Sequence, residues 1–189
     1  MKRSNAIQSI VEAGMMLALA TVLGQFIRIF TLPYGGSVTA GSMIPLLLIA
    51  MMRGPAVGIT VGILYGLIDY SFGGWMVSIV QWLLDYPLAF GTLGLAGVAW
   101  NPVRKGLVKS RRGQSLLAVA AAVVGIGGRF LSHFLAGIWF WGSYAPEGVP
   151  VWKYSLGYQA SYLVPEIILS AIILLFLAPT LMNFLKKRV

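Results

Sequence analysis

Residues 157–185 read GYQASYLVPEIILSAIILLFLAPTLMNFL, an apolar run in which Glu166 is the one acidic or basic side chain. A helix needs about 20 apolar residues to cross roughly 30 Å of hydrocarbon, so this segment is long enough to span a membrane. Gly, Pro and basic residues divide the rest of the chain into further apolar runs. We predict one integral membrane domain over 1–189, an all-α bundle of six transmembrane helices. The helices are expected at roughly 7–30, 42–52, 55–71, 75–99, 116–141 and 157–185.

The composition excludes several classes of protein. With 58% hydrophobic and 10% charged residues and a mean hydropathy of +0.84, the chain is too apolar for a domain with a polar shell. The net charge of +9 does not indicate nucleic acid binding, because the basic residues lie between apolar runs rather than in one stripe. The absence of cysteine excludes disulfides and thiol chemistry.

The distribution of basic residues predicts the orientation in the membrane. Placing the N-terminus inside puts eleven of the fourteen lysines and arginines on the cytoplasmic side, and only Arg28, Arg129 and Lys153 fall elsewhere. An excess of positive charge marks cytoplasmic loops. Both termini are therefore expected to be cytoplasmic.

The segment between the first two helices, residues 31–41, is rich in Gly and Pro and is predicted to be a loop. The helix that follows, 42–52, is too short to cross a bilayer unless this loop also enters the membrane. Irregular backbone at that depth is tolerated only where it is buried in protein or lines a cavity. We expect the loop to form a lid or a wall.

Polar side chains recur at helical spacing inside three of the apolar runs. Ionisable groups in such runs cost roughly 2.5 to 3.5 kcal/mol each and mark functional positions. The spacing puts each set on one face of its helix, with Gly137 leaving room for a close approach, and predicts that the three faces converge on a cavity. The sets are Ser78, Gln81 and Asp85, followed by Tyr86; Arg129, His133, Gly137 and Trp141; and Gln159, Tyr162 and Glu166.

Asp85 and His133 are candidate ligand contacts, because both fall close to the aromatic residues expected near the outer face. A carboxylate beside aromatic rings suits an organic cation, by charge and by a cation–π attraction of roughly 2 kcal/mol. For Arg129 we expect a structural role instead, a buried ion pair with Asp85.

Motifs for catalysis and for nucleotide binding are missing from the sequence. One histidine cannot supply a two-histidine zinc site, and neither a phosphate-binding Gly-x-x-x-x-Gly-Lys-Ser/Thr motif nor a Gly-x-Ser-x-Gly elbow occurs. We predict a binding protein without catalytic residues, metal or cofactor, which takes its energy from partner subunits or from an ion gradient. A small intramembrane hydrolase using His133 with a serine, and a stand-alone secondary transporter, remain as alternatives.

A pair of small residues on the first helix, Gly14 and Ala18, would let a helix of another subunit approach closely. These two positions are the expected partner-docking residues.

Three blocks of sequence resemble the thiamine-specific substrate-binding (S) components of energy-coupling factor (ECF) transporters. The blocks are residues 35–45, GGSVTAGSMIP; residues 84–90, LDYPLAF; and residues 128–137, GRFLSHFLAG, continued by GSYAPEG at 142–148. The likeness covers nearly the whole chain in order and spacing.

The resemblance implies a six-helix bundle in the bacterial plasma membrane, with a thiamine pocket near the outer face that the loop between helices one and two closes. It implies that a membrane coupling subunit and two cytoplasmic ATPases drive uptake, the coupling subunit docking at the position of Gly14 and Ala18. An S component for another vitamin or precursor is the alternative within this fold. By position, the resemblance implies these ligand contacts: Asp85, His133, Trp141, Tyr154, Gln159, Tyr86 and Trp75.

The sequence also departs from that family at three pocket positions. Better-known members have Glu where Asp85 stands and Asn where Gln159 stands, so the reach of each side chain differs by one methylene. A second stacking aromatic of those members aligns with Pro146, and Trp152 is the candidate to replace it.

Overall fold

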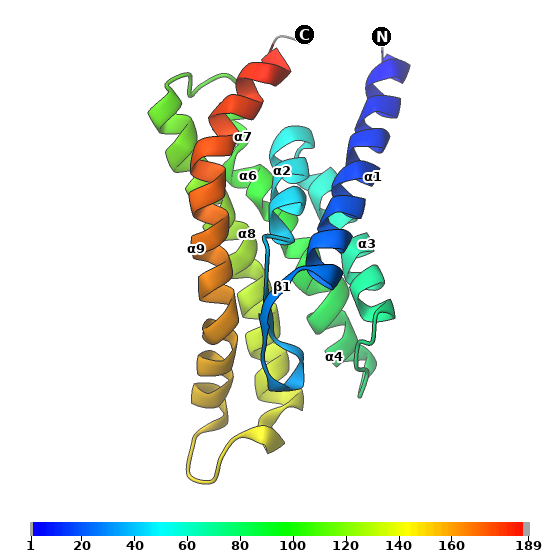
Figure 1. Cartoon of the computed structure of the whole chain (residues 1–189), viewed down its shortest axis with the longest axis vertical. Helices are drawn as coiled ribbons and strands as arrows, with labels where there is room; N and C mark the ends of the chain where they lie inside the picture. Colours follow the sequence, from blue (N-terminus) through cyan, green and yellow to red (C-terminus); the bar gives the residue numbers. More distant parts are fainter. Residues whose placement is uncertain (1, 187–189) are drawn as a thin grey trace.

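The fold consists of long helices around a short buried one, with a small hairpin on one side (Figure 1). The computed structural model describes residues 2–186, and side chains over 6–180. Lys187 and Arg188, two of the expected cytoplasmic basic residues, lie outside the described residues. Four helical stretches are long and apolar enough to cross a membrane, and two shorter apolar helices accompany them. The four are Ala6–Phe26, Ile79–Ala99, Arg111–Phe140 and Val151–Thr180.

The first helix, α1 (Lys2–Phe26), ends earlier than the sequence predicts, and the chain continues as a β-hairpin. Strand β1 (Arg28–Thr31) pairs antiparallel with β2 (Ser37–Thr39), Phe30 lying opposite Val38. The structure is mostly helical, as the sequence predicts, and adds one two-stranded sheet that the sequence did not predict. Strands form here because β-branched residues favour extended backbone, and such residues lie on both sides of a Pro-Tyr-Gly turn, η1 (Pro33–Gly35). They are Ile29 and Thr31 in β1 and Val38 and Thr39 in β2.

The second helix, α2 (Met43–Arg53), is the buried centre of the fold. Every residue from Met43 to Met51 is buried, which explains how so short a helix can be so apolar. Gly54, at a φ of 97°, turns the chain into α3 (Pro55–Ser71), because a left-handed backbone favours glycine.

The fourth helix, expected to be continuous over 75–99, is broken. It begins only at α4 (Ile79–Leu83), where the Ser78 hydroxyl caps the backbone N–H groups of Val80 and Gln81. A π-helical turn, η2 (Leu84–Leu88), follows because Pro87 cannot donate a backbone hydrogen bond. The remainder consists of short pieces: α5 (Ala89–Gly91), η3 (Thr92–Leu95), α6 (Ala96–Ala99) and α7 (Asn101–Arg104).

Two long antiparallel helices complete the fold. Helix α8 (Arg111–Phe140) begins five residues before the expected start at 116, and α9 (Val151–Lys186) begins six before 157, so the loop between them is short. A single turn, η4 (Gly142–Tyr144), follows α8. The start of α1 and the end of α9 lie at one end of the bundle, whereas the α8–α9 loop and the hairpin tip lie at the other (Figure 1).

Candidate functional site

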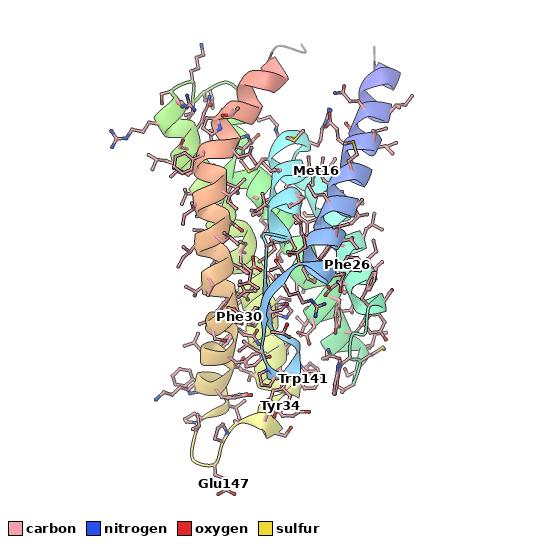
Figure 2. All side chains as sticks on the ribbon, in the orientation of Figure 1. Met16, Phe26, Phe30, Tyr34, Trp141 and Glu147 are labelled. Atoms are coloured by element: carbon pink, nitrogen blue, oxygen red, sulfur yellow. The ribbon has the colours of Figure 1, made fainter. Side chains whose placement is uncertain are left out.

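A cavity of about 270 Å³ lies beneath the hairpin, bounded by α3, the broken fourth helix, α8 and α9. Tyr34 and Trp141, which both line it, lie toward the end of the molecule that carries the α8–α9 loop (Figure 2). All but one of the site residues expected from the sequence line this cavity. Those on its lining are Trp75, Asp85, Tyr86, His133, Gly137, Trp141, Tyr154 and Gln159.

The Asp85 carboxylate is the centre of the polar contacts in the cavity. Its Oδ2 accepts hydrogen bonds from Gln81 Nε2 at 2.7 Å and from Trp141 Nε1 at 3.2 Å. Its Oδ1 lies 3.0 Å from His133 Nδ1. The side chain of Asp85 keeps only 14% of its surface exposed. Three donors, from α4, from α8 and from the residue that follows α8, thus fix the carboxylate in one orientation.

The break in the fourth helix positions Asp85. Its backbone belongs to the π-helical turn η2, which contains Pro87. Such turns shift the register of side chains and occur frequently at functional sites. Gln81 lies one turn earlier and bonds to Asp85, as their shared face predicts, but Ser78 caps the helix and does not line the cavity.

His133 separates Asp85 from Arg129. Arg129 Nε donates to His133 Nε2 at 3.2 Å, so this ring nitrogen is an acceptor and the proton lies on Nδ1, facing Asp85. The expected ion pair between Asp85 and Arg129 is therefore wrong. The guanidinium instead lies 4.2 Å from the centre of the Phe90 ring, a cation–π contact.

The same geometry leaves no activated serine. In a Ser-His-Asp arrangement the histidine nitrogen turned away from the carboxylate must accept the serine proton. Here that nitrogen, Nε2, already accepts a hydrogen bond from Arg129 Nε. The alternative of a hydrolase built on His133 has no support in this arrangement.

Gly137 makes the close approach of α8 and α9 possible. A Cβ at this position would lie 2.2 Å from Ser155 Oγ and 3.5 Å from Gln159 Nε2. The approach lets Ser155 Oγ donate to the Phe134 carbonyl at 2.9 Å and brings Gln159 to the His133 carbonyl at 3.4 Å. The room that glycine leaves is thus filled by α9.

Aromatic side chains form the rim of the cavity. The Tyr34 and Tyr144 rings lie 4.4 Å apart and the Trp141 and Tyr144 rings 6.0 Å apart, and all three residues line the cavity. On the opposite rim, the Tyr86 hydroxyl accepts from the Trp75 backbone N–H at 2.9 Å.

Trp152 is the exception among the expected site residues. It is 55% exposed and does not belong to the lining, so it cannot supply the ring that Pro146 lacks. It lies in the first turn of α9, which begins at Val151 and not at the expected position 157. Tyr34 and Tyr144 stand at the rim instead.

A second polar group on the lining was not predicted from the sequence. Gln25 Nε2 donates to Asp69 Oδ1 at 2.6 Å, and Arg28 Nη2 donates to Gln25 Oε1 at 2.9 Å. All three residues line the cavity, on the side of α1 and α3. Their positions in the sequence carry a signal that could have found them. Gln25 and Arg28 lie at the end of one apolar run and Asp69 lies near the end of another, which would indicate a polar contact between two helix ends.

Glu166 connects α9 to the hairpin. Its Oε1 accepts from the Thr39 backbone N–H at 2.6 Å and from Thr39 Oγ1 at 2.7 Å. Glu166 is 1% exposed and Thr39 is 6% exposed. The intramembrane carboxylate that the sequence left without a partner therefore fixes the base of β2.

These features define a class of protein. A helical membrane protein that encloses a cavity with a buried carboxylate and an aromatic rim is built to bind a small molecule. The chain belongs to the family described as "Thiamine transporter protein (Thia_YuaJ)", which it matches over residues 10–186. The family is one of transporters and not of enzymes.

Individual relatives agree with this assignment. The chain is 39% identical to the thiamine transporter ThiT of Bacillus subtilis (strain 168) over 190 residues, which cover 99% of this chain and 98% of that protein. It is 35% identical over 119 residues to the ThiT of Lacticaseibacillus paracasei, covering 60% and 59%. A solved structure of ThiT from Listeria monocytogenes superposes with a TM-score of 0.77 at 26% identity, covering 94% of this chain and 98% of that one. The family resemblance seen in the sequence is confirmed.

Proposed function

We propose that the chain captures thiamine with high affinity in this cavity, as the substrate-binding S component of an ECF-type importer. One observation carries the proposal. Asp85 is held by an amide, an indole and a neutral imidazole, and Arg129 is separated from it by the His133 ring. Neutral donors orient a carboxylate without cancelling its charge, so Asp85 keeps a negative charge to offer to a cation.

The charges around the cavity support a ligand with one positive charge. Three carboxylates and two guanidinium groups line it, and His133 is neutral in the tautomer that Arg129 imposes. With the carboxylates ionised, one negative charge remains without a counterpart. The carboxylates are those of Asp69, Asp85 and Glu166, and the guanidinium groups are those of Arg28 and Arg129.

Thiamine fits these groups by its chemistry. Its thiazolium ring carries a permanent positive charge, and its aminopyrimidine ring offers donors and acceptors. We assign stacking to Trp141, and hydrogen bonding or charge balance to Asp85 and His133. The walls come from Trp75, Tyr86, Gly137, Tyr154 and Gln159.

Transport would need energy from other subunits, since the sequence has no nucleotide-binding motif. We propose a membrane coupling subunit and two cytoplasmic ATPases as partners. The docking surface would be the exposed face of α1 around Gly14 and Ala18. A Cβ at Gly14 would have nothing within 4 Å, and Ile10 and Met15 beside it are 72% and 65% exposed.

The same proposal places the protein in the bacterial plasma membrane with six spans, α2 and α3 being two of them, and with both termini cytoplasmic. It is supported by the position of the start of α1 and the end of α9 at one end of the bundle (Figure 1). The end of α2 and the short helix α7 lie toward that end as well, and these two helices end in basic residues, Arg53 and Arg104. Basic residues gather on the cytoplasmic side of membrane proteins.

Titration of the purified protein with thiamine, followed by intrinsic tryptophan fluorescence, tests the proposal. We expect saturable binding of one thiamine per chain that riboflavin and biotin do not displace. Saturable binding of riboflavin or biotin by a protein that does not bind thiamine would identify an S component for another vitamin and overturn the ligand assignment.

A further inference from the structure

The hairpin that covers the cavity is attached to the rest of the protein unequally along its length. All four residues of β1 are exposed, whereas Val38 and Thr39 of β2 are buried. Strand β2 faces α9, which carries its attachment points. The hairpin forms one wall of the cavity, because Tyr34, Ser37 and Thr39 line it.

The base of the hairpin is held firmly on both strands. Thr39 of β2 bonds to the buried Glu166 carboxylate through its backbone N–H and its hydroxyl. At the start of β1, Arg28 bonds to Gln25, which bonds to Asp69 of α3. Breaking either attachment would leave a charged group in or near the protein interior without its partner, which is unfavourable.

Among the described residues, one hydroxyl group forms the hydrogen bonds between the tip and α9, and beside it the Tyr34 ring lies 4.4 Å from the Tyr144 ring. The Tyr158 hydroxyl accepts from the Gly36 backbone N–H at 3.0 Å and donates to the Pro33 carbonyl. The contact with Pro33 is exposed, so water can replace it when it breaks. Tyr158 and Glu166 lie two turns apart on α9, one at the tip and the other at the base.

We propose that the Tyr158 hydroxyl is a latch that sets the rate at which ligand enters and leaves the cavity, with the hairpin pivoting on the Thr39–Glu166 attachment. The proposal rests on the function proposed above, because it takes the cavity as the ligand site. The latch holds the same closed hairpin whether or not ligand is present. It therefore controls both rates and not the affinity.

Tyr158→Phe tests this directly, because it removes the hydroxyl and keeps the ring. In stopped-flow fluorescence with thiamine, we expect the association and dissociation rate constants to rise together, by about tenfold for two lost hydrogen bonds. The dissociation constant should change by less than about twofold. Ser161→Ala is the control, since its hydroxyl bonds to the Tyr158 carbonyl within α9, and it should change neither rate.

Unchanged rates in Tyr158→Phe would overturn the proposal. So would a rise of the dissociation rate alone with weaker binding, since that result would make Tyr158 a ligand contact.

A measurement without ligand separates this inference from the proposed function. The chain has no cysteine, so Ser37→Cys places a single thiol on the cavity side of β2. We expect maleimide to modify this thiol about tenfold faster in the Tyr158→Phe background, in proportion to hairpin opening. Faster labelling in a protein that does not bind thiamine would support the latch and count against the ligand. Equal labelling rates in a protein that binds thiamine would count against the latch.

Discussion

The Oδ1 atom of Asp85 and the Nδ1 atom of His133 lie 3.0 Å apart, and the other ring nitrogen of this imidazole, Nε2, accepts a hydrogen bond from Arg129 Nε. The ring thus stands between a carboxylate and a guanidinium that would otherwise pair. A direct ion pair would neutralise Asp85, whereas the intervening ring orients it and leaves its charge in place. We propose that this separation gives the cavity its affinity for a cation.

The protonation of His133 is the first consequence that can be measured. Because His133 is the only histidine in the sequence, ¹⁵N NMR of histidine-labelled protein gives one imidazole to observe. We expect a neutral ring with its proton on Nδ1 near neutral pH, since Nε2 must accept from Arg129 Nε. A ring protonated on both nitrogens, or on Nε2 alone, would contradict the arrangement.

Two tryptophans near the same end of the molecule should differ sharply in their effect on binding. Trp141→Ala removes a donor to Asp85 and a rim aromatic, so we expect thiamine binding to weaken by about 2 kcal/mol, roughly thirtyfold. Trp152→Ala is the matched control, because Trp152 lies outside the lining. Isothermal titration calorimetry of both variants would decide, and a similar loss in each would refute the placement of Trp152.

Gly137 offers a test of the packing between α8 and α9. In Gly137→Ala the new methyl group meets Ser155 Oγ, so we expect a loss of stability of about 1 to 3 kcal/mol and a lower melting temperature in detergent. Gly127→Ala is the control on the same helix, because a Cβ there has nothing within 4 Å. Equal melting temperatures for the two variants would show that the close approach is not needed.

The sequence predicts a helix best where turn residues mark both of its ends. The run at 55–71 coincides with α3, because Gly54-Pro55 and Phe72-Gly73 mark both ends. It fails where tertiary contacts decide the local structure. Residues 28–31 continue an apolar pattern but form a strand, since Thr39 is drawn to Glu166 and brings β2 alongside.

The candidate site also divides into features that local sequence predicts and features that only tertiary contacts decide. Helical spacing predicts that Gln81, Asp85, His133 and Gln159 face one cavity, and all four line it, because Asp85 lies at the start of η2 and is still one helical turn from Gln81. Spacing cannot show which buried charges meet, so Arg129 was assigned to Asp85 rather than to His133. Nor can it show the network of Gln25, whose partner Asp69 lies 44 residues away.

A substitution on α1 can separate the docking of partner subunits from the binding of ligand. Gly14→Leu fills the open space at the small-residue pair and should block a close helix approach, so we expect lower thiamine uptake into cells with unchanged thiamine binding. Gly157→Leu on α9 is the control, because a Cβ there also has nothing within 4 Å and the residue is exposed. Normal uptake by Gly14→Leu would move the docking surface elsewhere.

The uncancelled charge of Asp85 is tested most directly by calorimetric titration of thiamine into Asp85→Asn, a change that keeps the shape of the side chain and removes its charge. We expect the dissociation constant to rise about tenfold to a hundredfold, the value of a hydrogen bond or contact with a charged group. Glu147→Gln, which removes a carboxylate from the exposed loop after α8, should bind as the unmodified protein does (Figure 2). A dissociation constant for Asp85→Asn equal to that of the unmodified protein would contradict the account.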